Sequence, residues 1–191
     1  MLFQKMRNLI KSFFKTSIRN ANLFSFGQEK LILADIGSSG GLDIRWSVVN
    51  KYLKIYSFDP DLRASITESD NNIIFSKALW SENKKLKLNL TKFPDASSVY
   101  EINDKILKDF LNYECHKVIE TRDIEADNLK QILKEYTFPD FIKIDTEGAD
   151  LEILKGAGEL HDKQLIGIQI EVQFIERNIG SPFFSDIDSF C

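Results

Sequence analysis

Short apolar runs alternate with longer polar segments of helical periodicity from residue 31 onward, and this alternation constrains the fold more than any other feature. Buried strands are predicted at Leu31–Ile36, Leu53–Phe58, Ile73–Leu79, Phe141–Asp145 and Leu165–Val172. Helices are predicted at residues 42–52, 61–70, 100–112, 124–136 and 151–155. Strands that alternate with helices form a mostly parallel sheet covered on both faces. We therefore expect an α/β domain with a doubly wound sheet, whose ligands bind beyond the carboxyl ends of the strands.

Two other segments are predicted as strands. Residues Lys84–Leu90 alternate Leu with Lys and Asn at period two, which indicates a half-exposed strand that forms a hairpin with a neighbour. A further strand is expected at His116–Thr121.

Size and charge exclude several classes of protein. The 191 residues suggest one domain, and a net charge of -4 argues against a dedicated nucleic-acid binder. Cys115 and Cys191 are the two cysteines, so neither a disulfide framework nor a cysteine zinc site is supported. No apolar run approaches the ~20 residues of a membrane-spanning helix. We expect a cytoplasmic protein.

The first twenty residues differ from the rest of the chain. They carry five basic side chains and no acidic one, and their apolar residues have the spacing of one helix face. This pattern predicts a basic amphipathic helix and linker over residues 1–28, before the main domain at 29–191. Three interpretations stay open: a helix packed on the domain, a helix resting on an anionic membrane surface, or a protein-binding helix.

A glycine-rich loop follows the first predicted strand, and an acid follows the second. The loop reads Asp35-Ile36-Gly37-Ser38-Ser39-Gly40-Gly41, and the acid is Asp59. Glycines let the backbone approach a ligand closely, and a carboxylate at the second strand end can accept both hydroxyls of a ribose. The pair indicates a cofactor that contains a nucleoside.

The charge of Asp35 bears on which cofactor binds. A fixed carboxylate beside a pyrophosphate would cost on the order of 1–4 kcal/mol at 4 Å. S-adenosylmethionine has no phosphate and carries a positive sulfonium and a positive amino group, so Asp35 favours it over NAD. In the alternative interpretation, Asp35 only caps the following helix.

Several stretches in chain order then suggest a family. They are the loop at 35–41, Phe58-Asp59-Pro60, Lys77-Ala78-Leu79, Ser97-Ser98, and the run from Ile142 through Lys143-Ile144-Asp145-Thr146-Glu147-Gly148 to Ala157. Together they resemble the FkbM-type methyltransferases, which are S-adenosylmethionine-dependent enzymes that mostly methylate hydroxyls of sugars, polyketides and other small molecules. The Lys-Ile-Asp-x-Glu-Gly stretch is the most specific part.

This resemblance implies a Rossmann-like class I methyltransferase fold with S-adenosylmethionine as cofactor. It places Asp35, Gly37, Ser38 and Gly41 around the methionine portion and Asp59 on the ribose. Lys77, Ala78 and Leu79 would lie near the adenine. Asp59 replaces the more usual Glu, and the chain ends at Cys191, where the family normally continues with an antiparallel pair of strands. We therefore expect a catalytic domain that is incomplete at its C-terminus, or a partner, for example a second copy, that covers the sheet edge.

Acidic residues gather at the ends of the last two buried strands. Asp145 and Glu147 share one parity if their strand continues, and Glu171 follows on the next strand. Lys143 is expected to be internal and to need a carboxylate partner. Methyl transfer to a hydroxyl requires removal of its proton, so Asp145, Glu147 and Glu171 are the candidate catalytic bases. The same acids could instead hold Mg²⁺ or form a structural ion pair with Lys143; no metal site is assigned.

The sequence thus predicts a methyltransferase that acts on a hydroxyl of a small molecule or saccharide, without a nucleic-acid partner. Alternatives are an NAD-dependent oxidoreductase and a domain that binds S-adenosylmethionine without turnover. A nucleic-acid methyltransferase would have an Asn/Asp-Pro-Pro motif where this chain has Asp145-Thr146-Glu147-Gly148.

Overall fold

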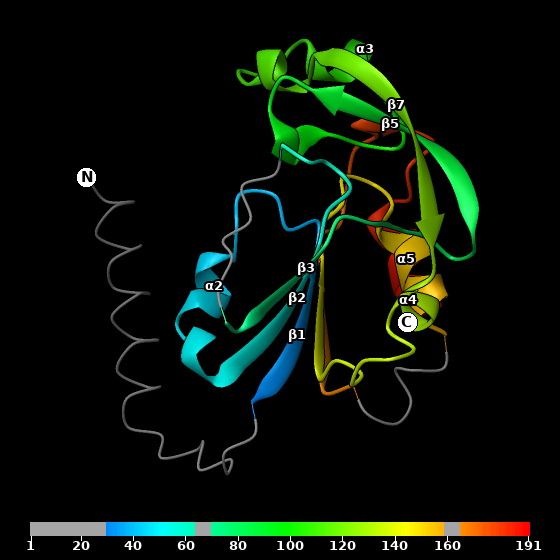
Figure 1. Cartoon of the computed structure of the whole chain (residues 1–191). Coiled ribbons are helices and arrows are strands. Elements are labelled where there is room, and N and C mark those ends of the chain that lie inside the picture. Colours follow the sequence, from blue (N-terminus) through cyan, green and yellow to red (C-terminus); the bar gives the residue numbers. More distant parts are fainter. Residues whose placement is uncertain (1–29, 64–69, 159–164) are drawn as a thin grey trace.

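The core of the protein is a five-stranded, all-parallel sheet (Figure 1). The computed structural model describes residues 30–63, 70–158 and 165–191. The strand order is β3-β2-β1-β8-β9, with bounds β1 Leu31–Ile36, β2 Leu53–Phe58, β3 Asn72–Phe75, β8 Phe141–Ile144 and β9 Gly167–Ile170. After β1, the chain adds β2 and then β3 on one side of it. It later returns to place β8 on the other side of β1, followed by β9. The strand order therefore reverses between β1 and β8, which is where α/β sheets bind ligands.

Helices cover both faces of this sheet, as predicted. Along β1, Leu33 packs with the residues around α2 (Ile44–Ser47) and η1 (Asn50–Tyr52), whereas Ala34 and Ile36 belong to the larger cluster on the opposite face. That cluster includes buried residues of α4 (Leu129–Ile132) and α5 (Asp150–Ala157). The strands are covered on both faces and are therefore continuous apolar runs, which is why the doubly wound fold could be predicted from the sequence.

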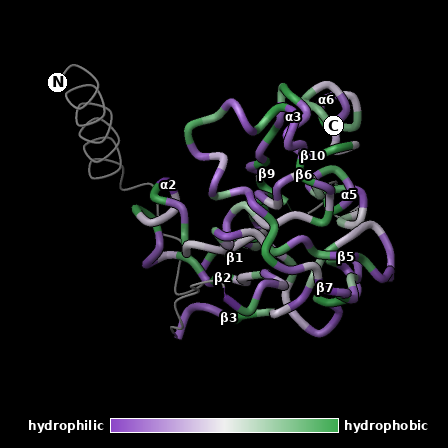
Figure 2. The backbone as a smooth tube through the Cα atoms, turned by 90° about the horizontal axis from the view of Figure 1, so that it is seen from above, coloured by the Kyte–Doolittle hydropathy of each residue, from purple (hydrophilic) through white to green (hydrophobic). Residues whose placement is uncertain are grey.

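A second sheet stands beyond the carboxyl ends of the parallel strands. Its order is β4 (Ala78–Leu79), β7 (Val118–Asp127) and β5 (Lys84–Thr91), with β5 antiparallel to β7. The 3-10 turns η2 (Pro94–Ala96) and η3 (Tyr113–His116) lie in its connections. The short strands β6 (Glu101–Ile102) and β10 (Asn178–Ile179) pair with each other. Figure 2 shows them grouped with α3 (Asp104–Leu107) and α6 (Phe184–Phe190), away from α2.

Several predicted elements were wrong in type or extent. The predicted strand Ile73–Leu79 is two strands, because β3 ends at Phe75 and β4 joins the second sheet. The half-exposed strand at Lys84–Leu90 is confirmed as β5, but its partner is the distant β7 instead of a hairpin neighbour. The predicted helix at 100–112 is β6 followed by a four-residue helix, because β6 pairs with β10 from much later in the chain.

The predicted helix at 124–136 is also wrong in its first part. Residues Ile124 to Asp127 continue β7, and α4 begins only after Asn128, whose side chain accepts a hydrogen bond from the backbone N–H of Gln131. An Asn in this position caps a helix start. At 42–52, the predicted helix is split into α2 and η1.

Some expectations fall outside the described residues. The basic helix at residues 1–20 lies there entirely, and most of the helix predicted at 61–70 does as well. Within the described ranges, no helix has the length and apolarity that crossing a membrane requires.

Candidate active site

The glycine loop after β1 is pinned against both neighbouring strands. The backbone N–H groups of Gly37 and Ser38 donate to the carbonyl oxygen of Phe58, at 2.9 and 3.2 Å. On the other side, a Cβ at Gly37 would lie 1.8 Å from the carbonyl oxygen of Asp145, and Gly37 has φ +75°. Only glycine fits there, for both conformational and steric reasons. The loop therefore fixes the ends of β1, β2 and β8 together.

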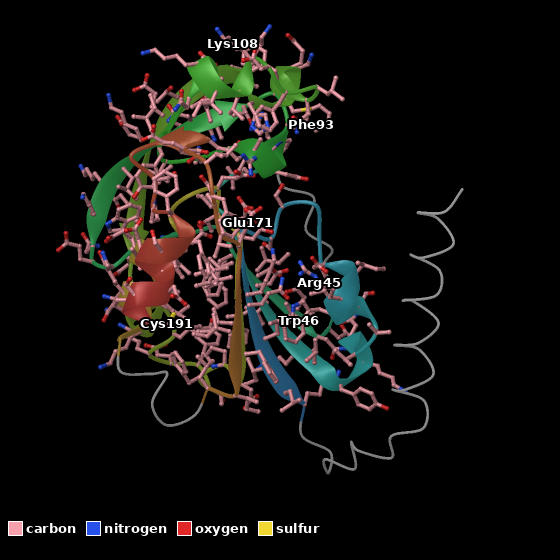
Figure 3. The ribbon with its side chains drawn as sticks, turned by 180° about the vertical axis from the view of Figure 1, so that it is seen from behind. Arg45, Trp46, Phe93, Lys108, Glu171 and Cys191 are labelled. Atoms are coloured by element: carbon pink, nitrogen blue, oxygen red, sulfur yellow. The ribbon has the colours of Figure 1, made fainter. Side chains whose placement is uncertain are left out.

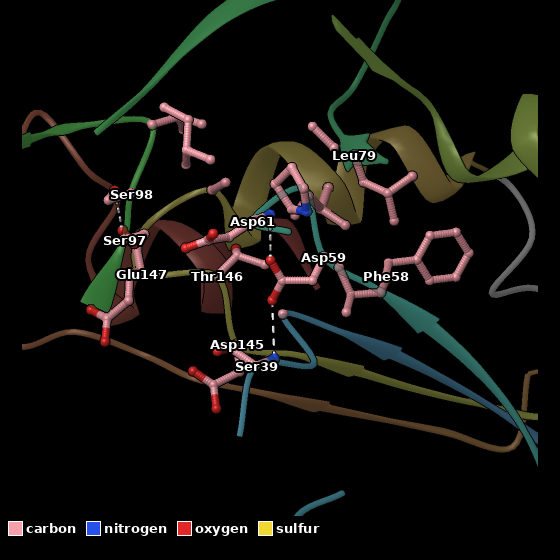
Figure 4. A pocket seen from close by; sticks show the side chains of 18 of the residues that line it. Ser39, Phe58, Asp59, Asp61, Leu79, Ser97, Ser98, Asp145, Thr146 and Glu147 are labelled. Carbon is pink, nitrogen blue, oxygen red and sulfur yellow. Dashed lines mark hydrogen bonds between the residues drawn. The ribbon is translucent and has the colours of Figure 1, made fainter. Parts of the chain in front are cut away.

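A cavity opens beyond these strand ends (Figure 4). Its walls come from the glycine loop, the end of β2, the segment into β4, the turn η2 and the loop after β8. Five carboxylates and one lysine are among the lining residues: Asp59, Asp61, Asp95, Asp145, Glu147 and Lys77. Ile36, Phe58, Leu79, Leu88, Val99 and Ile153 supply apolar surface. The lining of the cavity is thus apolar in part and also carries an excess of acidic side chains.

Asp59 is a buried acid of the cavity wall. Its two oxygens accept hydrogen bonds from the backbone N–H of Ser39, at 3.0 Å, and of Asp61, at 2.8 Å (Figure 4). Burial raises the pKa of Asp59 to about 6 despite these donors, and the nearby Asp61 and Asp95 add to the increase. Each oxygen retains a lone pair, so the carboxylate can still accept hydroxyl groups of a ligand.

Lys143 is buried beneath the cavity, with 4% of its surface exposed. Its Nζ lies 3.1 Å from Oδ1 of Asp35 and 3.5 Å from Oδ2 of Asp145, and it donates to the carbonyl oxygen of Gly37 at 3.1 Å. Burial alone would lower the pKa of Lys143, but the two carboxylates outweigh it and the pKa is raised. The prediction that Lys143 is internal and paired with carboxylates is confirmed.

Glu147 occupies a strained position in the loop after β8. It has φ 53°, the left-handed region that side chains other than glycine rarely adopt. Nη2 of Arg177 lies 3.1 and 3.3 Å from its two carboxylate oxygens, and Ser98 donates to its carbonyl oxygen at 2.7 Å. Burial raises the pKa of Glu147 in spite of Arg177. A network from three parts of the chain therefore holds this acid in place.

Asp150 holds the loop after β8 in place through hydrogen bonds of its carboxylate. Its Oδ1 accepts hydrogen bonds from the N–H and the hydroxyl of Thr146, at 3.0 and 3.1 Å, and its Oδ2 accepts from the N–H of Gly148 at 3.0 Å. The side chain is buried, and burial raises its pKa. Asp150 begins α5, so the loop is anchored to the helix that covers the sheet.

Glu171 follows β9 and lies beside Asp145. Figure 3 shows it at the carboxyl end of the strand, above Trp46 and Arg45 of α2. Burial, a hydrogen bond with Asp145 and repulsion from Asp145 and Glu147 raise the pKa of Glu171 to about 8. Its Oε2 is buried without a hydrogen-bond partner. Within the described part of the chain, no cation forms an ion pair with this carboxyl, in contrast to Asp145 and Glu147.

The structure brings most of the predicted site residues together. Gly37, Asp59, Lys77, Ala78, Leu79, Asp145 and Glu147 line the cavity. Asp35, Ser38, Gly41 and Glu171 lie outside the lining: Asp35 pairs with Lys143, Ser38 is buried in the loop, and Glu171 interacts with Asp145. The predicted shared parity of Asp145 and Glu147 does not apply, because β8 ends at Ile144.

Sequence reasoning missed three charged residues of the site, Asp61, Asp95 and Arg177. Asp95 lines the cavity and accepts a hydrogen bond from the Ser39 hydroxyl at 2.7 Å. Its position just before Ser97-Ser98, one of the stretches that resembled the family, was the available signal. Arg177 lies in a loop with no recognisable pattern, and only the folded chain brings it to Glu147.

Metal binding receives no support from the arrangement of these acids. Among the residues that the structure describes, no three His, Cys, Asp or Glu side chains are grouped as they would be around a metal ion.

The comparisons identify the family. A family model described as the methyltransferase FkbM domain matches residues 52–191, which is well over half of the chain and includes Asp59, Lys143, Asp145, Glu147 and Glu171. The glycine loop precedes the matched range. Searches of curated proteins and of solved structures gave no match. On the strength of the family match and of a Rossmann-like parallel sheet, the chain belongs to the FkbM methyltransferase family.

Proposed function

We propose that the protein is an S-adenosylmethionine-dependent methyltransferase that methylates a hydroxyl group of a small molecule or saccharide. The family match supports the reaction class. The observation that supports the methyl donor is the charge of the cavity, where five carboxylates and one lysine meet at the switch point of the sheet. A negatively charged lining attracts a ligand with cationic groups and repels a ligand with a pyrophosphate, such as NAD.

The residues of the cavity fit this cofactor. Asp59 has lone pairs free for two ribose hydroxyls, and Leu79 and Ala78 offer an apolar wall for the adenine. Asp145 lines the cavity and is 41% exposed in its side chain, whereas Asp35 is buried and compensated by Lys143. We therefore assign the attraction of cationic groups mainly to Asp145. Asp35 contributes indirectly, because it compensates the positive charge of Lys143.

When bound, S-adenosylmethionine supplies a methyl group that is activated by a positively charged sulfur. The protein must orient the acceptor hydroxyl and take its proton. Of the three acids predicted as bases, Asp145 is held by Lys143 and Glu147 by Arg177. Glu171 has no such cation, and its Oε2 lacks a hydrogen-bond partner. We therefore assign Glu171 as the group that accepts the proton.

The raised pKa of Glu171, about 8, suits this role. A base works best when its pKa is close to the working pH, because it is then partly ionised and still binds a proton strongly.

Calorimetric titration with S-adenosylhomocysteine tests the cofactor assignment. Wild type should bind, and Asp59→Ala should weaken binding at least tenfold, because two hydroxyls lose their acceptor. Asp123→Ala removes an exposed acid on β7 and should leave binding unchanged. Binding of NADH in place of S-adenosylhomocysteine by the wild type would overturn the proposal.

The proton acceptor is tested separately, by transfer of a labelled methyl group to candidate hydroxyl acceptors. Glu171→Gln should keep S-adenosylhomocysteine binding and lose turnover. Full activity in this variant would exclude Glu171 as the base and leave the methyl donor assignment intact.

A further inference from the structure

The carboxylate of Asp59 is held at both of its oxygens by backbone donors. Oδ2 accepts a hydrogen bond from the N–H of Ser39 at 3.0 Å, and Oδ1 accepts one from the N–H of Asp61 at 2.8 Å (Figure 4). Ser39 belongs to the glycine loop after β1, whereas Asp61 lies in the segment after β2. The position of this carboxyl group therefore depends on where two separate backbone segments lie.

The first of these donors is fastened to the second sheet by a side chain. The hydroxyl of Ser39 donates to Oδ1 of Asp95, a residue of η2, at 2.7 Å. The other oxygen of Asp95 lies 3.3 Å from the place that a Cβ at Gly40 would occupy. The carboxyl group of Asp95 thus lies close to the tip of the glycine loop and ties it to η2.

The second donor is fastened to the same sheet through Arg63. The guanidinium group contacts both carboxylate oxygens of Asp61, with Nη2 at 2.6 Å from Oδ2 and Nε at 3.0 Å from Oδ1. Nη1 of Arg63 donates to the carbonyl oxygen of Thr91, the last residue of β5, at 2.9 Å. Asp61 is buried, and a bidentate pair of this kind fixes the orientation of both side chains.

Both fastening points lie in one short stretch of the chain, residues 91–97. The backbone N–H of Thr91 donates to the hydroxyl of Ser97 at 3.2 Å, and the hydroxyl of Thr91 donates to the carbonyl oxygen of Phe93. Thr91 is fully buried, so this turn is fixed at the end of β5. A single turn of the second sheet therefore holds the donors of both Asp59 oxygens.

We propose that Asp95 and Arg63 are positioning residues, which fasten the second sheet to the two backbone donors of Asp59 and so hold this carboxyl group in place for the ribose hydroxyls of the cofactor. The role of Asp59 on the ribose rests on the proposed function, whereas the fastening of its donors does not. In this role, Asp95 acts through Ser39, and Arg63 acts through Asp61. The second sheet then contributes to cofactor recognition without a contact to the ribose.

The first measurement is NMR amide hydrogen exchange on the full chain without any ligand. The protection factor of a backbone N–H reports how rarely its hydrogen bond opens. Asp95→Ala should lower the protection of the Ser39 amide about fivefold, the effect of one lost hydrogen bond, and leave the Asp61 amide unchanged. Arg63→Lys keeps a cation for Asp61 but lacks the fork that reaches Thr91, so it should lower only the Asp61 protection, again about fivefold.

Conservative and control variants separate the fastening from a general effect of charge. Asp95→Asn removes the charge but keeps an oxygen that accepts from the Ser39 hydroxyl, so the Ser39 amide should keep its wild-type protection. Asp123→Ala and Lys155→Met remove exposed charges on β7 and α5 and should change neither amide. Unchanged protection of the Ser39 amide in Asp95→Ala, or an Asp95→Asn variant as poorly protected as Asp95→Ala, would overturn the proposal.

The second measurement asks whether the fastening serves the ribose. Calorimetric titration compares S-adenosylhomocysteine with its 2′-deoxy analogue, and the ratio of the two affinities reports the contribution of one ribose hydroxyl. The ratio should be about ten in wild type, since a hydrogen bond to a charged group is lost, and close to one in Asp59→Ala. Asp95→Ala and Arg63→Lys should lower the wild-type ratio about threefold. A cavity that is merely looser would weaken both ligands equally, and an unchanged ratio would refute the positioning role.

The two measurements distinguish this proposal from the proposed function. If the wild type does not bind S-adenosylhomocysteine, the proposed function fails, while amide exchange still decides whether the donors of Asp59 are fastened. Circular dichroism verifies that each variant folds. If Arg63→Lys does not fold, the Asp95→Ala and Asp95→Asn variants decide, because they change an exposed side chain and leave the buried Asp61 paired.

Discussion

The carbonyl oxygen of Asp145 occupies the place where a side chain at Gly37 would begin. The distance from an ideal Cβ to that oxygen is 1.8 Å, too short for any residue other than glycine. This contact brings the end of β1 against the end of β8, the two strands between which the sheet order reverses. The closeness of the glycine loop to the acids is therefore built into the backbone and does not depend on side chains.

The first prediction follows from this contact. Gly37→Ala should destabilise the fold by about 3 kcal/mol or more, since overpacking adds to the cost of a left-handed backbone. Gly180→Ala is the matched control, because Gly180 has nearly the same φ, +76°, but open space around it. That variant should lose only about 1 kcal/mol. Urea denaturation measures both, and equal losses would show that the contact with Asp145 can relax.

The second prediction concerns the pH dependence of cofactor binding. The pKa of Asp59 is raised to about 6 by burial, so this carboxyl takes up a proton as the pH falls below 6. A protonated carboxyl loses one acceptor site for ribose hydroxyls. The affinity for S-adenosylhomocysteine should therefore be constant from pH 7 to 8 and fall up to tenfold per pH unit below 6. Calorimetry at pH 5, 6 and 7.5 measures this, and Asp59→Ala should remove the dependence.

The core of the fold could be predicted because its signals are local. Strands such as Leu53–Phe58 are short apolar runs bounded by polar residues, and β2 has these bounds. The helix predicted at 124–136 was wrong in its first part because two apolar spacings follow each other there. Ile124 and Ala126 alternate along β7, whereas Leu129 and Leu133 have helical spacing in and after α4. An apolar spacing that fits both patterns does not reveal the change at Asn128. Pairing between β5 and β7 over a long sequence separation decides the outcome.

For the site, the sequence predicted several of the acids and a carboxylate partner for Lys143, but not the cation that pairs with Glu147. Strand ends placed Asp59 and Asp145 at the edge where parallel strands bind ligands. The partner of Glu147 could not be predicted, because Arg177 reaches it from a loop with no periodicity. The assignment of Glu171 as base likewise needed the structure, since it depends on which acids already have a cation.

The third prediction concerns how protein stability depends on pH through the carboxyl group of Glu171. Its pKa in the fold, about 8, lies above the ordinary value of 4.5, so folding binds a proton between these pH values. The stabilisation from this carboxyl is complete below pH 4.5 and is lost as the pH rises through about 8. Glu171→Gln mimics the protonated form at every pH. Its Tm should equal that of wild type at pH 5 and exceed it by about 3 °C at pH 9.

Differential scanning calorimetry at both pH values checks this expectation. The exposed Glu125→Gln on β7 is the control and should show no difference between the two pH values. A Glu171→Gln variant that is no more stable than wild type at pH 9 would contradict the raised pKa.

The fourth prediction concerns the ion pair between Arg177 and Glu147. Arg177→Met leaves a carboxyl with 13% side-chain exposure beside other acids and without its cation. The cost should be about 2 kcal/mol at pH 8. Burial already raises the pKa of Glu147, and loss of Arg177 raises it further, so protonation should reduce the cost at pH 5. Chemical denaturation at the two pH values measures the difference. Arg122→Met, which breaks an exposed pair with Glu120, should cost less than about 1 kcal/mol at either pH.

The last prediction concerns Asp150, which holds the loop that carries Asp145 and Glu147. Asp150→Ala removes the acceptor of three hydrogen bonds, two of them from the backbone N–H groups of Thr146 and Gly148. Unpaired buried donors are costly, so the fold should lose about 3 kcal/mol. Thr146→Val removes only the hydroxyl bond and should lose about 1 kcal/mol. Because Glu147 keeps its left-handed backbone only while the loop is tied at both sides, Asp150→Ala should also weaken S-adenosylhomocysteine binding at least tenfold, and Thr146→Val should not. Calorimetric titration of the folded variants separates the two effects. If Asp150→Ala binds as wild type does, Asp150 stabilises α5 without shaping the site.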